Sequence, residues 1–273
     1  MVEMHFWMLG VLFEPQYSYG RIALTKFFTF ISIFDNIYDS YSTLEESRLL
    51  TMAMERWDEQ AAEHLPGYMK FFYSKVLATM KVVEKDLDSQ GNKHADYIKK
   101  LLIDATKCYY NEAKWREETD TVTVEEHLRF SVPSSCCMHV ACLAFVVIGA
   151  SGDAIEWGMT YPKIMRASCV IGRVINHVAS HEVTYLQLSV MSTVEACMEE
   201  NNYTAKEDAY KKLRELIEES WMDISEELLK PAPLLEAVVN STRMLDFLYK
   251  DQGAYTDPRA LKVVVDSIYV NPI

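Results

Sequence analysis

Apolar residues recur at intervals of three and four along most of this 273-residue chain, and no segment alternates with a period of two for long. That spacing predicts amphipathic helices rather than strands. The chain has nine glycines and eight prolines, so it offers few places at which a helix must end. The main predicted helices cover residues 21–39, 46–62, 67–87, 95–115, 124–148, 162–185 and 207–229. We therefore expect one all-α domain over residues 1–273.

Local signals mark where several of these helices begin. A Thr followed by Glu three residues later is typical of a capping box, in which each side chain bonds the other residue's backbone N–H. The pattern occurs at Thr43 with Glu46, Thr123 with Glu126, and Thr204 with Glu207. Three prolines suit the first turn of further helices, namely Pro162, Pro231 and Pro258.

Two predicted helices, over residues 22–34 and 136–148, are apolar on nearly all sides. A helix of that kind must be buried on most of its surface. The first of them carries four phenylalanines, Phe27, Phe28, Phe30 and Phe34. Two interpretations remain open, a plain hydrophobic core and an apolar cavity lined by aromatic rings.

Charge and cysteine usage narrow the partners and the compartment. Forty acidic and 27 basic residues give a net charge of −13, which disfavours nucleic acid and anionic membrane surfaces as partners. An anionic substrate would need local cations or a metal. The six cysteines form no CxxC pair, and the N-terminus lacks the pattern of a secretory or transit peptide. The longest apolar run, about 15 residues, is too short to span a bilayer. We expect a cytoplasmic protein with reduced thiols.

Two groups of polar residues could carry chemistry. Asp35 and Asp39 are four residues apart, so both carboxylates lie on one helix face, where they could hold Mg²⁺ or could form a solvated helix end. The second group is a polar stripe on the otherwise apolar helix over residues 162–185. This stripe faces either solvent or a wet cavity, and it consists of Arg173, Asn176, His177, Ser180, His181 and Thr184.

Several segments, taken in order, resemble a known family. They are residues 6–18, the Asp35-Asn36-Ile37-Tyr38-Asp39 motif, Tyr110-Asn111-Glu112 with Trp115, and the segment from Arg173 to Ser180. Over nearly its whole length the chain resembles the catalytic α domain of plant sesquiterpene synthases, which are class I terpene synthases. The resemblance implies a single helical bundle around an apolar central cavity. It also implies an isoprenoid diphosphate substrate of sesquiterpene or monoterpene size and Mg²⁺ as cofactor.

The resemblance also implies roles for individual residues. Mg²⁺ would be held by Asp35, Asp39, Glu112, Asn176 and Ser180. Arg173 would take the released diphosphate, and the rings of Trp7, Phe28 and Tyr255 would stabilise a carbocation. The expected substrate-binding residues are Trp7, Phe28, Phe34, Ser135, Cys136 and Cys137.

The chain departs from the family pattern in several independent places. Asn36 stands at the second Asp of the first motif, while His177 and Thr184 replace the Asp and Glu of the second motif. Gln187 stands where the family has Arg, and the loop at residues 252–255 keeps Tyr255 without its acidic neighbour. The family's Arg-x-Arg loop and N-terminal helical domain would precede residue 1. We therefore expect a retained cavity with a weakened Mg²⁺ site.

Three functions follow from this mixture of matches and departures. The first is a working terpene cyclase with Mg²⁺-assisted ionisation of a diphosphate. The second is a metal-independent enzyme in which His177 and Asp35 or Asp39 perform acid–base cyclisation or isomerisation of an apolar substrate. The third is a catalytically dead relative that binds a terpenoid or a protein partner.

Overall fold

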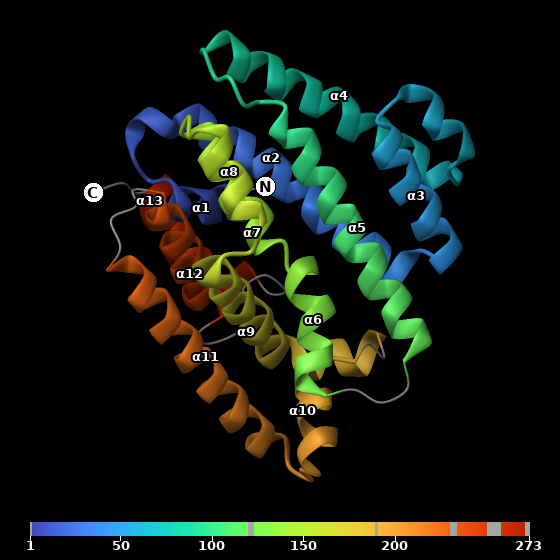
Figure 1. Ribbon diagram of the computed structural model, residues 1–273, viewed down its shortest axis with the longest axis vertical. Coiled ribbons are helices and arrows are strands. Elements are labelled where there is room, and N and C mark those ends of the chain that lie inside the picture. The colour runs from blue at the N-terminus through green and yellow to red at the C-terminus, as the bar shows by residue number, and fades with distance from the viewer. Residues whose placement is uncertain (1, 120–122, 189–190, 230–233, 250–257, 271–273) are drawn as a thin grey trace.

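The computed structural model describes residues 2–119, 123–188, 191–229, 234–249 and 258–270, and these residues form helices and connecting loops without a strand (Figure 1). The all-α prediction is confirmed. The α-helices are α1 (Val2–Val11), α2 (Ser18–Asn36), α3 (Leu44–Arg56), α4 (Gly67–Ser89), α5 (Tyr97–Glu118), α6 (Val124–Ser134), α7 (Cys137–Val147), α8 (Gly152–Met159), α9 (Lys163–Leu188), α10 (Thr193–Asn201), α11 (Lys206–Leu228), α12 (Leu235–Tyr249) and α13 (Lys262–Tyr269). Four shorter helical turns are η1 (Pro15–Tyr17), η2 (Ile37–Tyr41), η3 (Glu59–His64) and η4 (Pro258–Leu261).

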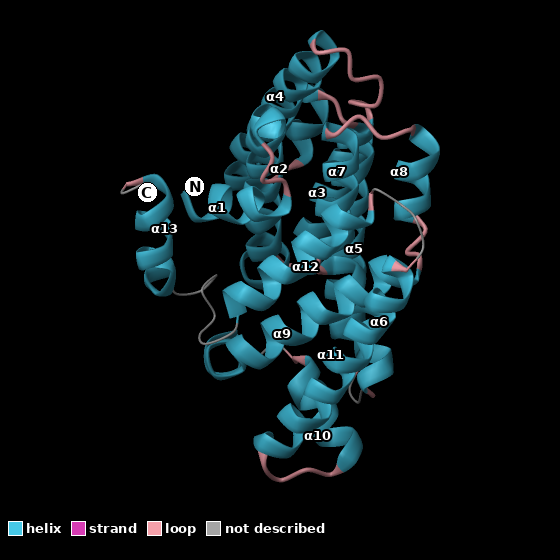
Figure 2. Ribbon diagram, turned by 90° about the vertical axis from the view of Figure 1, so that its left-hand side faces the viewer, coloured by secondary structure: helices cyan, strands magenta, loops and turns pink. Residues whose placement is uncertain are grey.

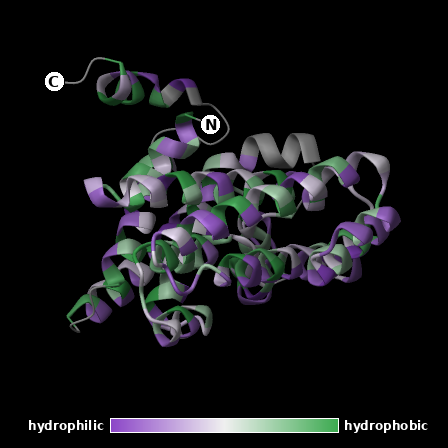
Figure 3. Cartoon of the chain, turned by 90° about the horizontal axis from the view of Figure 1, so that it is seen from above, coloured by the Kyte–Doolittle hydropathy of each residue, from purple (hydrophilic) through white to green (hydrophobic). Residues whose placement is uncertain are grey.

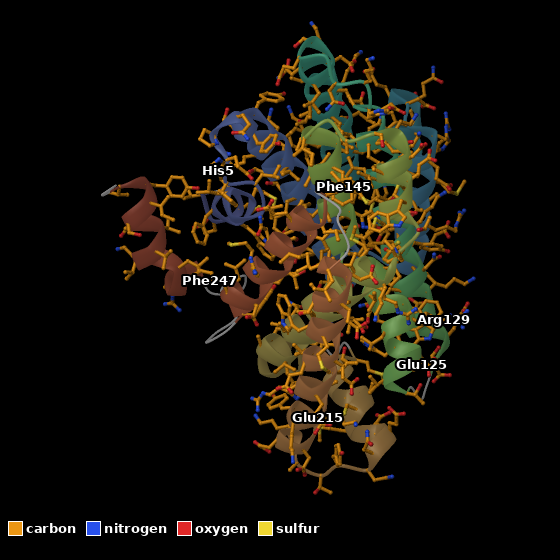
Figure 4. The ribbon with its side chains drawn as sticks, turned by 60° about the vertical axis from the view of Figure 1, so that its left-hand side comes forward. His5, Glu125, Arg129, Phe145, Glu215 and Phe247 are labelled. Atoms are coloured by element: carbon orange, nitrogen blue, oxygen red, sulfur yellow. The ribbon has the colours of Figure 1, made fainter. Side chains whose placement is uncertain are left out.

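Helix α7 lies at the centre of the bundle. It packs against α2, α5, α8, α9 and α12, and α9 in turn packs against α11 and α12. Phe145 on α7 is fully buried between the surrounding helices, whereas Glu125, Arg129 and Glu215 lie at the surface (Figure 4). The predicted apolar helix is thus buried on all sides, as its composition requires.

Amphipathic helices cover this centre. Hydrophobic and hydrophilic residues share most helices, as the periodicity predicts (Figure 3). Figure 2 shows α4 near one end of the molecule, α10 at the other and α13 set to one side. Helix α13 has no buried residue, and it contacts α1 through a hydrogen bond of 2.7 Å between the Tyr269 hydroxyl and His5 Nδ1. It is the most loosely attached helix among those described.

The expectation that the longest apolar run is too short to span a bilayer is corrected, because the stretch from Val124 to Val147 is long and apolar enough to do so by length and composition alone. Most of its apolar window, 78%, is buried inside the bundle, which is the pattern of a core helix in a globular domain.

The prediction of a single helix over residues 124–148 is wrong, because this segment is divided into α6 and α7. Cys136 adopts a left-handed conformation with φ of 57°, and this turn separates the two helices.

The predicted helix starts are confirmed at two of three capping boxes. Thr43 and Thr123 cap α3 and α6 with reciprocal bonds to Glu46 and Glu126. The box at Thr204 is wrong, because α11 begins at Lys206 after Ala205 and so places Glu207 too close to the helix start. A third box forms instead at the start of α10, between Ser192 and Glu195.

Other helix boundaries also differ from the prediction. Helix α3 ends at Arg56, well before residue 62, because Trp57 takes a left-handed conformation with φ of 53°. Pro162 directly precedes α9, and Pro258 opens the short η4 turn rather than an α-helix. Pro231 lies outside the described residues.

Candidate active site

A cavity opens between α1, α2, α5, α7, α9 and α12, beside the turn that joins α6 to α7. Its empty volume is about 690 Å³, the open mouth included. The lining is mostly apolar or small, with one carboxylate and one guanidinium. The lining residues are Trp7, Phe28, Ile31, Ser32, Asp35, Tyr109, Ser134, Ser135, Cys136, Cys137, Val140, Gly172, Arg173, Asn176, Ser241, Leu245 and Tyr249.

Aromatic rings form one wall of this cavity. The Trp7 and Phe28 rings meet edge to face with centroids 4.7 Å apart, and the Tyr249 ring lies 6.5 Å from Trp7. Both Trp7 and Phe28 were expected to line the cavity from the family resemblance, and both do so. Tyr249 is an addition from the structure. Such rings can stabilise a cation over their faces.

Phe34 does not line the cavity, so that expectation is corrected. Its side chain is fully buried, with its ring centroid 4.9 Å from that of Phe72 on α4. Phe28, Ile31 and Asp35 share one face of α2, and Phe34 points about 120° away from Phe28 at roughly 100° per residue. It therefore belongs to the contact between α2 and α4.

The turn between α6 and α7 supplies a second wall. Ser135, Cys136 and Cys137, all expected to bind substrate, line the cavity. Close packing behind this wall requires a glycine, because a Cβ added at Gly172 would lie 2.6 Å from Cys137 Sγ. A side chain at position 172 would force Cys137 or Leu245 to shift where α9 lies against α7.

The acidic residues gather around Asp35, and neither Asp39 nor Glu112 is in the lining of the cavity. Asp35 lines the cavity from α2, Glu112 is buried on α5, and Asp39 lies beyond the end of α2. Residues Ile37–Tyr41 form a π-helical turn, in which the backbone N–H of Ser42 donates to the carbonyl oxygen of Ile37. Such turns are common at functional sites, and this one sets where Asp39 stands relative to Asp35.

Two arginines offset these carboxylates. Arg116, on α5, makes an ion pair of 2.8 Å with Asp39. Arg173, on α9, donates from Nε to the carbonyl oxygen of Ser131 at 2.7 Å and from Nη2 to Ser134 Oγ at 3.0 Å. These bonds hold its guanidinium at the cavity wall, where an anionic group could meet it.

The pKa shifts report this crowding of charge. Burial and the neighbouring charge of Asp39 raise the pKa of Asp35 to about 7. Burial also raises the pKa of Asp39, although Arg116 opposes the rise. Burial acts to raise the pKa of Glu112 as well, but Arg173 and Arg116 outweigh it and the pKa is lowered. Three carboxylates thus share two guanidiniums, and Asp35 is the least compensated.

His177 does not reach the cavity, which corrects the expectation that it acts as an acid–base group at the polar end. Its Nδ1 accepts from the backbone N–H of Thr193 at 3.0 Å and lies 2.7 Å from Thr193 Oγ1. Burial, together with the charge of Arg173, keeps its pKa well below the usual value. His177 is a neutral, hydrogen-bonded residue behind Arg173. His181 pairs instead with Glu195, with Nδ1 2.9 Å from Oε1.

The second motif is only partly directed at the cavity. Asn176 lines the cavity, and its amide nitrogen donates to the Tyr249 hydroxyl at 2.9 Å. The Ser180 hydroxyl donates to the Asn176 carbonyl oxygen at 2.7 Å, and Ser180 is not among the lining residues. The side chain of Thr184 and all of Tyr255 lie outside the described part of the chain.

Sequence reasoning missed several site residues. Tyr109, Ser241, Leu245 and Tyr249 all line the cavity. Arg116 was also missed, although it lies four residues after Glu112, the spacing that puts two residues on one face of a helix. That spacing was the only available signal for Arg116, while the residues of α12 gave none.

Another titratable group lies apart from the cavity lining. His139 on α7 is fully buried, and its Nε2 lies 2.9 Å from Asp104 Oδ2 on α5. The Cys108 thiol lies 3.9 Å from the same carboxylate oxygen. Burial acts to raise the pKa of Asp104, but the bond to His139 lowers it overall. This pair fastens α5 to α7 behind the cavity.

Comparisons with known proteins agree on the family. Residues 1–223 match the model of the terpene synthase family, metal binding domain. An (E)-beta-caryophyllene synthase of Zea mays is 47% identical over 279 aligned positions, which cover 100% of this chain and 51% of that protein. An alpha-humulene synthase of Zingiber zerumbet is 37% identical over 99% of this chain and 50% of that protein. The chain thus spans about half the length of these curated relatives.

Solved structures show the same fold. The isoprene synthase of grey poplar superposes with a TM-score of 0.87 at 28% identity, over 100% of this chain and 52% of that one. The same enzyme in complex with three Mg²⁺ ions and dimethylallyl-S-thiolodiphosphate gives a TM-score of 0.84 at 29% identity, over 96% of this chain and 52% of that one. The matches in sequence and in structure agree, and they show that this chain belongs to the terpene synthase family.

Proposed function

We propose that this chain is the catalytic part of a terpene cyclase, which ionises an isoprenoid diphosphate of sesquiterpene or monoterpene size and closes the resulting carbocation into a ring. One observation carries the proposal. An aromatic-lined apolar cavity has one carboxylate, that of Asp35, and one fixed guanidinium, that of Arg173, in its lining, and the charges of Asp39 and Glu112 act on Asp35. An isoprenoid diphosphate has the matching division into a long apolar tail and an anionic head.

The donor set fits Mg²⁺. Asp35, Asp39 and Glu112 offer hard oxygen ligands of the kind that this ion prefers. The raised pKa of Asp35 points the same way, since burial and the charge of Asp39 leave this carboxylate short of positive charge. Bound Mg²⁺ would supply the charge that makes a diphosphate a good leaving group. Asp35, Asp39 and Glu112 would hold it on the α2–α5 side.

The protein's own groups would divide the remaining work. Arg173, held by Ser131 and Ser134, would orient the diphosphate and keep it after it leaves. Trp7, Phe28 and Tyr249 would stabilise the carbocation through their ring faces. The apolar lining would exclude water, which would otherwise quench the cation before the ring closes.

The Mg²⁺ site on the α9 side is proposed to be the weaker one. Asn176 donates from its amide nitrogen to the Tyr249 hydroxyl, and Ser180 donates from its hydroxyl to the Asn176 carbonyl oxygen, so the side-chain oxygens of both residues keep acceptor lone pairs for a metal ion. Thr184 stands where the resembled motif has Glu, so this side lacks a charged ligand among Asn176, Ser180 and Thr184. A high requirement for free Mg²⁺ is the expected kinetic consequence.

The metal-independent alternative has less support. It needs a titratable His177 at the cavity, whereas the pKa of His177 is held well below its usual value and its Nδ1 accepts from the backbone of Thr193, outside the cavity lining. The binding-protein alternative is excluded if the chain forms product, and it is favoured if the folded chain binds a terpenoid without forming product. Within the part of the chain that the structure describes, no geometric feature favours either alternative over the cyclase.

Product analysis with farnesyl and geranyl diphosphate, with and without Mg²⁺, tests the proposal. We expect a Mg²⁺-dependent hydrocarbon or alcohol from the wild-type chain and its loss by more than about a hundredfold in Asp35→Asn. A matched control is Asp104→Asn, which alters another half-buried carboxylate that lies outside the cavity lining. Turnover that persists in EDTA would contradict the proposal, as would Asp35→Asn with wild-type activity.

A further inference from the structure

The ion pair between Arg116 and Asp39 occupies the carboxylate that closes the first motif. Arg116 Nη1 lies 2.8 Å from Asp39 Oδ1, and Nη2 donates to the Tyr38 carbonyl oxygen at 3.4 Å. Both side chains are largely buried, at 17% and 26% exposure. In the absence of metal, Asp39 therefore already has a cation.

Arg116 is also close enough to the other charged groups to influence them. Its charge lowers the pKa of Glu112 and opposes the rise in the pKa of Asp35. The second guanidinium, on Arg173, opposes the protonation of Arg116. Arg116 and Arg173 thus act on the same group of carboxylates from α5 and α9.

The surroundings of Arg116 leave room for movement. Arg116, Asp39 and Ser42 line a second hollow beside the cavity, together with Tyr38 and Trp115. Arg173, by contrast, is buried and held by two hydrogen bonds to α6. Of the two guanidiniums, Arg116 is the one that can change partners.

We propose that Arg116 is a built-in counter-ion. Its guanidinium neutralises Asp39 before the metal binds, and the side chain then moves to form an ion pair with the diphosphate. The inference rests on the proposed function. In this proposal Mg²⁺ displaces the guanidinium from Asp39 Oδ1 when it takes that oxygen, so Arg116 and Mg²⁺ compete for the Asp39 carboxylate. A guanidinium binds two phosphate oxygens at once, so the diphosphate offers Arg116 a better partner than a single carboxylate oxygen. Arg116 thereby couples metal loading to the arrival of substrate.

This exchange of partners would also compensate for an arginine of the resembled family that this sequence lacks. Gln187 stands where the resembled family has an arginine. A guanidinium delivered from α5 would restore a second positive grip on the diphosphate beside Arg173. The charge would come from a different helix but act on the same group.

Binding measurements without turnover test this inference. Isothermal titration calorimetry would measure Mg²⁺ alone, and then inorganic pyrophosphate at saturating Mg²⁺, on the wild-type chain and on Arg116→Gln. We expect Arg116→Gln to bind Mg²⁺ three- to tenfold more tightly, because the competitor is gone. We expect the same variant to bind pyrophosphate about tenfold more weakly, because a grip is gone.

Two further variants sharpen the test. Arg48→Gln removes an exposed guanidinium that pairs with Glu45 on α3, and it should leave both affinities within twofold of wild type. Arg116→Lys keeps the charge but loses the two-pronged geometry, so Mg²⁺ affinity should stay near wild type while pyrophosphate affinity falls. Arg116→Lys also remains informative if Arg116→Gln fails to fold.

The outcomes separate the inference from the function beneath it. Equal or weaker Mg²⁺ binding by Arg116→Gln would overturn the counter-ion role, and unchanged pyrophosphate binding would overturn the transfer. In either case the proposed function would stand. If the wild-type chain binds no Mg²⁺ even with pyrophosphate, the proposed function fails and the inference fails with it.

Discussion

At the residue scale, the main property of the site is that its three carboxylates have only two guanidiniums, those of Arg116 and Arg173, to balance their charge. Asp35 lines an apolar cavity, and Asp39 holds the nearer guanidinium. Glu112 keeps a lowered pKa because two guanidiniums act on it. Of these three carboxylates, Asp35 is therefore the one whose ionisation lowers the free energy of unfolding most when no metal is bound.

The raised pKa of Asp35 predicts an unusual pH dependence of stability. A carboxyl whose pKa rises to about 7 on folding binds more protons in the folded state than in the unfolded one between about pH 4 and pH 7. The free energy of unfolding therefore falls as the pH rises through that window. Asp35→Asn should raise it by about 1–3 kcal/mol at pH 8 and leave it nearly unchanged at pH 4.

Urea unfolding in metal-free buffer with EDTA at both pH values would check this prediction. Asp104→Asn serves as a control of opposite sign, because the pKa of Asp104 is lowered by its bond to His139. A destabilised Asp35→Asn at pH 8 would show that the carboxylate is better compensated than its surroundings indicate.

His177 gives a second prediction at this scale. His177→Gln keeps a hydrogen-bonding side chain but loses the imidazole, so we expect a loss of about 1–2 kcal/mol in the free energy of unfolding from the bonds to Thr193. The pH profile of turnover should keep its shape, because His177 is neutral and lies behind Arg173. The disappearance of one limb of that profile would restore His177 as an acid–base residue.

At the element scale, the cavity exists because particular helices either break or approach closely. Cys136 in a left-handed conformation turns the chain between α6 and α7, and Ser135, Cys136 and Cys137 line the cavity there. A π-helical turn carries α2 past Asn36 to Asp39. Gly172 lets α9 lie against α7.

Gly172→Ala should destabilise this contact. The added methyl group would lie 2.6 Å from Cys137 Sγ and 2.9 Å from Leu245 Cδ1, and overpacking of this kind costs about 1–3 kcal/mol. The double variant Gly172→Ala with Cys137→Ala removes the nearer clash and should recover at least about half of the loss. Chemical denaturation of the two single variants and the double variant measures the coupling, and strict additivity would place the strain elsewhere.

At the scale of the whole molecule, stability decreases from the centre outward. Helix α7 is buried along its length, whereas α13 has no buried residue and meets α1 through the pair of Tyr269 and His5. Local opening follows the number of buried apolar contacts. Hydrogen exchange should therefore be faster at amides of α13 than at those of α7 by more than about a thousandfold. Equal protection would mean that the chain opens only as one unit.

The sequence predicted long periodic helices more accurately than it predicted caps and helix breaks. Long periodic segments such as α4, α5 and α11 fall close to their predicted bounds, because apolar spacing and few breakers act locally. Thr204 failed as a capping residue, and the helix predicted over 124–148 divides at Cys136. Those errors arise where a short local signal meets a packing requirement from other helices, and tertiary contacts then decide.

By itself the sequence determined that the chain is all-α, that its apolar central helix is buried, and that Asp35, Trp7, Phe28 and Arg173 lie at one cavity. These properties depend on periodicity, composition and motifs, which are local or matched in order along the chain. The tertiary structure alone decided that Phe34 turns to α4, that His177 stands behind Arg173 and that Arg116 holds Asp39. The reason is physical: the helical period gives the face on which a residue lies, and only packing gives the partner across that face.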